Sequence, residues 1–534
     1  MKKALSLLLA CLMMLSLSAA LAESSELVDG KFTETRQITV EIYDRNNDGG
    51  TDPENNVWTD YIKKGMLEKY NVEVTFVPVG RWTETDDMNN LLAAGDAPDV
   101  CVTYSYPTIQ TYANMGGVID LAPLLAEYKD LLPNLWDLLG DENIYWDLDP
   151  ETGNLWAIEA LRADDGRARI NTFVREDWLK KLDMAAPTTE AEFEAMLIAF
   201  KDNAELLLGE DAASMIPFSI SYDVGWRADH LLTSYMPSDL SDKDAYINGF
   251  DDRNMLYPGF KEGVRKLNEW YNKGLIWQDF AIYGSGDTTE DNLIKAGFVG
   301  AFMHNWDYPY RSGIDGIHYA LQQIDPEAGY IAIESFLNDA GEYKKFLYSP
   351  TDRKVFFPST NDEPLASLLY VDFISDLETR KFMQIGVEGI NHTVLETGAI
   401  QNLGAQGEYI QNSLNNIDYT ITINGLDLGD ADLNAASLAL GYGYVDARYI
   451  KTAFDAAMND GYSAAHINAG AIQAEDGMGP ALNAKRDTFL PQAIAAPVDQ
   501  FDAVYDAGME DYLASGGQAI IDERTEAYAK YYEQ

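Results

Sequence analysis

The hydrophobic and polar positions in the first part of the chain predict strands that alternate with helices. The β-branched run QITVEIY (37–43) predicts a strand, and helical spacing follows in WTDYIKKGMLEKY (58–70). A second strand at NVEVTFVPV (71–79) precedes a helix at MNNLLAAG (88–95) and a strand at APDVCVTY (97–104). This alternation indicates βαβ units and a largely parallel sheet, in which ligands contact the loops at the carboxyl ends of strands.

Helical patterns dominate the rest of the chain. Segments 173–184, 188–203 and 260–275 have helical spacing, and Thr188 is suited to cap the second of them. Segment 292–306 reads as a helix end followed by a buried strand, and the C-terminal third is mostly helical. A chain of 534 residues exceeds what one hydrophobic core supports, and it has no Pro-rich linker. We therefore expect two lobes that the chain crosses several times.

The first 22 residues have the pattern of a secretory signal peptide. Two lysines precede an apolar run that ends in Ala20-Leu21-Ala22. We expect cleavage after Ala22 and a protein exported beyond the cytoplasmic membrane, secreted or at the cell surface. Leu8 to Cys11 formally matches a lipoprotein cleavage box, but cleavage there would leave a second apolar stretch exposed. A lipid anchor at Cys11 is thus the less favoured alternative.

Charge and cysteine content narrow the function further. The chain carries 87 acidic and 38 basic residues, a formal net charge of −49. Nucleic acids and anionic membranes are poor partners for such a surface, because phosphate binding needs clustered Lys and Arg. Cleavage after Ala22 leaves only Cys101, so no disulfide forms within the mature chain and a large core must provide its stability.

The stretch YDRNNDGGTDPENN (43–56) begins like a calcium-binding loop. Asp44, Asn46 and Asp48 fall at alternate positions before Gly49, as in a helix–loop–helix calcium site. However, this loop follows a strand, and Asn55 occupies the twelfth position, where a bidentate Glu belongs. We therefore expect a metal-free loop that contacts a ligand.

Catalytic and cofactor motifs are absent from the sequence. Its five histidines show no HExxH spacing, and no nucleophile elbow, phosphate-binding P-loop or dinucleotide loop occurs. We expect no enzymatic activity, no metal and no cofactor. Paired carboxylates for glycoside hydrolysis stay open as an alternative, since so acidic a chain always offers such pairs.

Several aromatic residues lie in polar contexts that favour a carbohydrate site. Trp82 follows Arg81, Tyr104 and Tyr106 flank a serine, and both Trp226 and Trp306 have glycine or polar neighbours. Sugar rings have apolar faces and polar rims, so their sites combine flat aromatics with Asp, Asn and Arg. A single Trp is more often a core residue, and helical spacing assigns Trp178 to the core.

Several short segments of the sequence, taken in order, resemble those of one protein family. The sequence resembles the family 1 extracellular solute-binding proteins of ABC importers, in particular the long subgroup with alginate-oligosaccharide binders and LplA-type lipoproteins. The resemblance covers essentially the whole mature chain. Its marks are YDRNN with NNVWTDYIKK (43–47, 55–64), LLAAGDAPDV (91–100), GGVIDLAPLLAEY (116–128), NLWAIEAL (154–161), VREDWLKKLDMAAPTTEAEFEAML (174–197), LNEWYNKGLI (267–276), VEGINHTV (387–394) and IIDERTEAYAKYY (520–532).

The resemblance implies an α/β fold of the periplasmic-binding-protein-like type II, with a ligand cleft between two hinged lobes. Lobe one would comprise 23–165 and 330–395, and lobe two 166–329 and 396–534. Alginate-binding members have a calcium loop where this chain has AELLLGEDAASM (204–215), which lacks the alternating ligands. The resemblance thus adds no metal site.

We therefore expect a monomeric binding protein that delivers a carbohydrate, an oligosaccharide by preference, to the permease subunits of an ABC transporter. A peptide binder of the same fold is the runner-up, and an exported glycoside hydrolase is a distant third. The expected ligand contacts are Asp44, Arg45, Asn47, Trp82, Tyr104 and Tyr106 from lobe one and Trp226, Arg227, Trp306 and Asp307 from lobe two.

Overall fold

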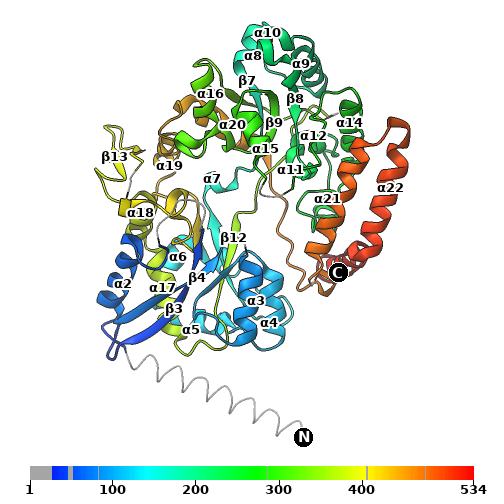
Figure 1. Cartoon of the computed structure of the whole chain (residues 1–534). Coiled ribbons are helices and arrows are strands. Elements are labelled where there is room, and N and C mark those ends of the chain that lie inside the picture. Colours follow the sequence, from blue (N-terminus) through cyan, green and yellow to red (C-terminus); the bar gives the residue numbers. More distant parts are fainter. Residues whose placement is uncertain are drawn as a thin grey trace. The chain divides into compact units, whose positions relative to one another are not determined.

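The chain folds into two compact units. The computed structural model describes residues 27–45, 52–81, 83–284, 287–338, 340–404, 407–475 and 477–533 (Figure 1). Unit 1 comprises the residues up to Ala163 with Thr351–Thr393 and Leu403–Ala431. Unit 2 comprises Asp164–Pro350, Val394–Asn402 and the residues from Asp432 onward. Among the described residues the chain passes between the units five times.

Two segments fall in a different unit from the one that the sequence predicts. Residues 330–350 lie in unit 2 because strand β10 (Tyr330–Ile333) pairs with β7 (Ile170–Arg175) of that unit. Residues 403–431 lie in unit 1 because β15 (Ile423–Asn424) pairs with β6 (Ile158–Arg162). Both pairings join strands far apart in sequence, which hydrophobic patterns cannot anticipate.

Unit 1 begins with the predicted βαβ unit. Strand β3 (Arg36–Asp44) pairs in parallel with β4 (Val72–Gly80) across helix α2 (Val57–Tyr70). Strand β5 (Cys101–Thr103) is linked to β3 by the parallel bridge between Val40 and Val100. Beyond it, β12 (Thr351–Phe356) runs antiparallel to both β5 and β6. The expected largely parallel sheet is therefore incorrect for this part, because β12 re-enters unit 1 in the opposite direction.

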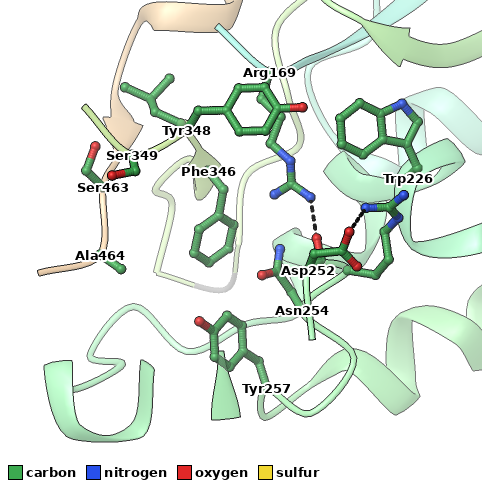
Figure 2. Close-up of a pocket in the computed structure, with 12 residues that line it drawn as sticks. Arg169, Trp226, Asp252, Asn254, Tyr257, Phe346, Tyr348, Ser349, Ser463 and Ala464 are labelled. Carbon is green, nitrogen blue, oxygen red and sulfur yellow. Dashed lines mark hydrogen bonds and ion pairs between the residues drawn. The ribbon is translucent and has the colours of Figure 1, made fainter. Parts of the chain in front are cut away.

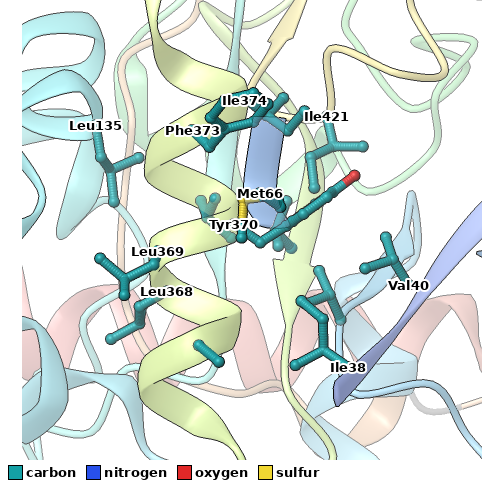
Figure 3. Packing of buried hydrophobic residues seen from close by; sticks show 14 of the residues in the cluster. Ile38, Val40, Met66, Leu135, Leu368, Leu369, Tyr370, Phe373, Ile374 and Ile421 are labelled. Atoms are coloured by element: carbon teal, nitrogen blue, oxygen red, sulfur yellow. The ribbon is translucent and has the colours of Figure 1, made fainter. Parts of the chain in front are cut away.

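The core of unit 1 surrounds a helix that is buried on every side. Helix α17 (Pro364–Ser375) is buried from Leu365 to Ser375 and packs among Ile38, Val40 and Leu135 (Figure 3). One charged group lies within this helix. Asp372 accepts hydrogen bonds from the backbone N–H groups of Asn134 and Leu135, at 2.8 and 3.0 Å. These bonds satisfy free donors in the first turn of helix α6 (Pro133–Ile144).

Unit 2 contains a mixed sheet in the order β10-β7-β9-β8. Strand β9 (Val299–Asn305) pairs antiparallel with β7 and parallel with β8 (Ile216–Ser219). Helices α9 (Glu190–Asp202) and α14 (Phe260–Asn272) contribute buried side chains to the same core. Helix α9 is capped by Thr189 rather than the expected Thr188, whose hydroxyl instead donates to Glu192 at 2.9 Å.

A short pairing in unit 2 joins two distant segments. Strand β11 (Lys345–Phe346) pairs in parallel with β16 (Gly461–Tyr462). The backbone N–H of Leu347 extends this contact by donating to the carbonyl of Tyr462 at 2.9 Å. Residues 346–349 are thus fixed beside residues 462–464, where they form one wall of the pocket described below.

No helix in the described part of the chain is both long enough and apolar enough to cross a membrane. Cys101 is fully buried, and burial raises the pKa of its thiol well above the ordinary value.

Candidate functional site

A pocket of about 330 Å³ opens within unit 2 (Figure 2). Aromatic rings, guanidinium groups and small polar side chains line it together. The lining residues are Arg169, Trp226, Asp252, Arg253, Asn254, Tyr257, Phe346, Leu347, Tyr348, Ser349, Ser463 and Ala464.

A tight turn at residues 251–254 places three of these residues. The carboxylate of Asp251 accepts the backbone N–H of Arg253 at 2.9 Å, and its carbonyl accepts the N–H of Asn254 at 3.1 Å. Asn254 has a left-handed backbone with φ of 61°, which asparagine tolerates better than most residues. Asp251 is itself held by Arg486, whose Nη1 lies 3.0 Å from its Oδ2.

Two arginines lie over the ring of Trp226. The guanidinium carbons of Arg169 and Arg253 are 5.2 and 4.9 Å from the ring centroid. Trp226 belongs to helix α11 (Val224–Arg227), and its indole N–H donates to Asn305 at 3.3 Å. Cation–π contacts at these distances favour a fixed ring position. Trp226 is therefore a pre-organised part of the pocket wall.

Arg253 is tied to carboxylates. Its Nε and Nη2 both donate to Asp223 at 2.8 Å, and its Nη1 donates to Asp252 at 2.5 Å. Burial acts to lower the pKa of Arg253, but the hydrogen bonds to Asp223 and the charges of Asp223 and Asp252 together raise it above the ordinary value. The guanidinium stays charged, and its donors are already directed at acidic oxygens.

Arg169 is similarly engaged. Its Nη2 donates to the carbonyl of Asp252 at 3.0 Å, and its Nη1 lies 3.6 Å from the carboxylate of Asp229 (Figure 2 shows the first contact). Burial raises the pKa of Asp229, while Arg169 and Arg253 act to lower it. The charges around the pocket thus compensate one another inside the protein.

The aromatic rings form two pairs. The rings of Trp226 and Tyr348 have centroids 6.3 Å apart at an angle of 35°, and those of Tyr257 and Phe346 stack at 5.7 Å. Flat rings beside polar groups match the apolar faces and hydroxylated rims of sugars. The pocket therefore has the chemistry of a carbohydrate site.

Of the four residues expected to bind ligand from this part of the chain, only Trp226 lines the pocket. Arg227 is buried and pairs with Glu290 through two 2.6 Å bonds. Trp306 is buried against Tyr442 and Phe454. We exclude Arg227 and Trp306 from the site because both are committed to the core.

Asp307 is excluded for the same reason. It is 2% exposed and accepts hydrogen bonds from Tyr442 and Arg311, both at 2.6 Å. The glycine and polar neighbours that suggested a surface position for Trp306 and Asp307 belong to the end of a buried strand.

Unit 1 brings several of its predicted residues to the carboxyl ends of its first strands. Asp44 ends β3, and its carbonyl accepts the N–H of Arg81 at 2.9 Å. The guanidinium of Arg81 lies 4.3 Å from the ring centroid of Tyr104. Arg45 forms a two-bond pair with buried Asp418, at 2.6 and 3.0 Å. Arg45 thus has a structural partner within its own unit.

The other predicted residues of unit 1 are less informative. Tyr106 begins helix α4 (Tyr106–Asn114), and its hydroxyl donates to the carbonyl of Asp147 at 3.4 Å. Asn47, Trp82 and the rest of residues 46–51 in the calcium-like loop lie outside the described residues.

Most residues that line the pocket were not predicted from the sequence. Arg253 and Asn254 lie in FDDRNMLY (250–257), a polar run flanked by aromatics, which is the signal that singled out Trp226. Tyr348 and Ser463 had no such signal, because only the pairing of β11 with β16 brings their segments together.

Within the described ranges, no three His, Cys, Asp or Glu side chains cluster in a way that could bind an ion. Residues 204–214, at the place of the family's calcium loop, form helix α10 (Ala204–Leu208) and the 3-10 turn η2 (Gly209–Ser214).

The chain is similar in sequence to several known proteins. No family model matches the chain. It is 24% identical to the lipoprotein LipO of Bacillus subtilis over 63% of this chain and 65% of that protein. It is 25% identical to the fructooligosaccharide ABC transporter substrate-binding protein FusA of Streptococcus pneumoniae, over 41% and 38% of the two chains. The chain thus spans less than two thirds of the length of these relatives.

Solved structures extend the likeness to nearly the whole chain. The alginate-binding protein AlgQ2 matches with a TM-score of 0.61 and 18% identity, covering 93% of this chain and 98% of that one. FusA in complex with kestose matches with a TM-score of 0.62 and 14% identity, covering 93% and 100%. The chain therefore has the α/β fold of the periplasmic-binding-protein-like solute-binding proteins. By their names, FusA is an ABC transporter substrate-binding protein and AlgQ2 is an alginate-binding protein, which is the kind of protein that the sequence resembles.

Proposed function

We propose that this protein is an extracytoplasmic substrate-binding protein that captures an oligosaccharide and passes it to an ABC permease. The observation that carries the proposal is the unit 2 pocket, where the rings of Trp226, Tyr348, Tyr257 and Phe346 lie beside fixed polar groups. Its support comes from FusA, which is named for fructooligosaccharide, and from AlgQ2, which is named for alginate. The protein acts without catalysis and as a monomer.

The pocket in unit 2 offers both aromatic and polar contacts to a sugar. Trp226 and Tyr348 offer aromatic surface, while Asn254 and Ser349 offer polar atoms. In unit 1, Asp44 and Tyr104 form a separate candidate surface at the carboxyl ends of the first strands.

Export follows from the predicted signal peptide, and the B. subtilis relative is named a lipoprotein. We propose a mature chain that starts at Glu23 without a lipid. Mass spectrometry of the exported protein tests this, and a diacylglyceryl group on Cys11 would reverse it.

A thermal-shift screen against neutral and acidic oligosaccharides and against short peptides tests the function. A sugar at about 100 times its Kd should stabilise the protein by about 2.7 kcal/mol. Stabilisation by peptides alone would replace the proposal with its runner-up.

A further inference from the structure

The charged groups around the unit 2 pocket are already paired with one another. Three guanidinium groups lie in or behind its wall: Arg169, Arg253 and Arg486. Five carboxylates adjoin them: Asp223, Asp229, Asp251, Asp252 and Asp487. Acidic groups therefore outnumber basic ones at this site, and each guanidinium has at least one carboxylate within 4 Å.

An anionic sugar would need the opposite arrangement. A uronate is bound most strongly by a guanidinium whose two-pronged donor edge is directed at the ligand. Arg253 instead directs its Nε and Nη2 at Asp223, both at 2.8 Å. A carboxylate entering here would displace an internal partner or remain unpaired among like charges, and either outcome is costly.

One polar group in the pocket has no internal partner. Among the described residues, the buried side-chain nitrogen of Asn254 has no hydrogen-bond partner, although the residue is only 8% exposed. Leaving such a donor unpaired costs free energy, whereas an acceptor from a ligand would satisfy it. Figure 2 shows the Asn254 amide among the side chains that line the pocket.

We infer that this pocket takes an uncharged sugar ring and that Asn254 donates a hydrogen bond to one of its oxygens. The inference rests on the proposed function and narrows it to neutral oligosaccharides. The aromatic rings supply contact with the sugar faces, Asn254 supplies the directional bond, and the paired arginines fix the wall without recruiting an anion.

The first test compares neutral fructo-, gluco- and galacto-oligosaccharides with oligogalacturonates of equal length by isothermal titration calorimetry. We expect the tightest neutral sugar to bind at least about tenfold better than any uronate. A uronate that binds equally well or better would overturn the inference while leaving the proposed function intact. If no sugar of the panel binds measurably, the proposed function itself is overturned.

The second test is Asn254→Gly, titrated with the tightest neutral sugar. Glycine accepts the left-handed backbone, so the melting temperature should not fall. The affinity should fall by about tenfold or more, because the ligand oxygen loses its donor. The matched control is Asp183→Gly, which has a similar φ of 51° elsewhere in unit 2 and should bind like the wild type. Unchanged affinity in Asn254→Gly would overturn the assignment of Asn254.

The third test removes one carboxylate partner of Arg253. Asp223→Asn keeps the shape of the side chain but removes the charge that engages Arg253. We expect the ratio of uronate to neutral-sugar affinity to rise by about fivefold or more, since Arg253 loses one of its two carboxylate partners and the Nε and Nη2 donors no longer face a charge. An unchanged ratio would show that internal pairing does not set the preference.

Discussion

At the scale of single residues, Trp226 and Trp178 differ in what surrounds their rings. Trp178 is fully buried against Phe200, whereas Trp226 lines a pocket. Trp226→Ala should weaken sugar binding by about 1–3 kcal/mol, as loss of an aromatic anchor does. Trp178→Ala should instead lower the free energy of unfolding by about 3–5 kcal/mol. Calorimetric titration and thermal melts of both variants measure the two effects.

Trp306→Ala is the control for this pair. Because Trp306 packs inside unit 2, the variant should melt early like Trp178→Ala and bind sugar normally while folded. If Trp306→Ala loses binding without losing stability, its exclusion from the site is contradicted.

His230 provides a pH-dependent signature of the unit 2 core. Burial lowers the pKa of His230 to about 3, and its Nδ1 lies 2.9 Å from the hydroxyl of Thr172. In the unfolded chain the imidazole of His230 binds a proton below about pH 6.5, whereas in the folded protein it stays neutral down to about pH 3. The folded protein therefore becomes less stable relative to the unfolded chain as the pH falls from 6.5 towards 3. His230→Asn removes this dependence. The difference between the two stability profiles should slope by up to about 1.4 kcal/mol per pH unit in that window.

Measuring urea unfolding between pH 7 and pH 4.5 tests the His230 prediction. Taking the difference between variant and wild type cancels the contributions of other groups. Parallel profiles would show that His230 is protonated in the folded protein.

At the scale of elements, the start of helix α14 depends on Gly259. This residue has φ of 88°, and a Cβ there would lie 1.9 Å from the carbonyl oxygen of Tyr235. Gly259→Ala should lower the free energy of unfolding by about 2 kcal/mol or more, through backbone strain and overlap. Gly116→Ala is the matched control, with φ of 77° and open space, and should cost about 1 kcal/mol. Equal melting temperatures for the two variants would contradict the steric part of this explanation.

Sequence patterns predicted several individual elements. Strands β3, β4 and β9 and helices α2 and α9 occur where period and capping residues indicated them. Sequence patterns could not predict which strands pair, because β12 and β15 pair with strands that lie far away in the chain. For the same reason the sequence identified Trp226 but not Tyr348, whose place in the pocket depends on the pairing of β11 with β16.

At the scale of the whole molecule, the fold agrees with the resemblance seen in the sequence, but two segments depart from the pattern of a calcium-binding loop. Residues 204–214 form helical turns, and Asn55 replaces the expected bidentate Glu in the loop after β3. Chelator should therefore leave the melting temperature unchanged. A drop of several degrees that calcium restores would reveal a site that these segments do not predict.

The central claim is that the protein binds an oligosaccharide and leaves it unchanged. Isothermal titration calorimetry with the tightest sugar of the panel tests this directly, because binding gives heat that returns to baseline and turnover gives heat that persists. We predict a saturable isotherm with one sugar per chain and a Kd of about 1 μM or tighter, equivalent to about −8 kcal/mol. Persistent heat from sugar cleavage, or saturation by peptides with no response to any oligosaccharide, would contradict the account.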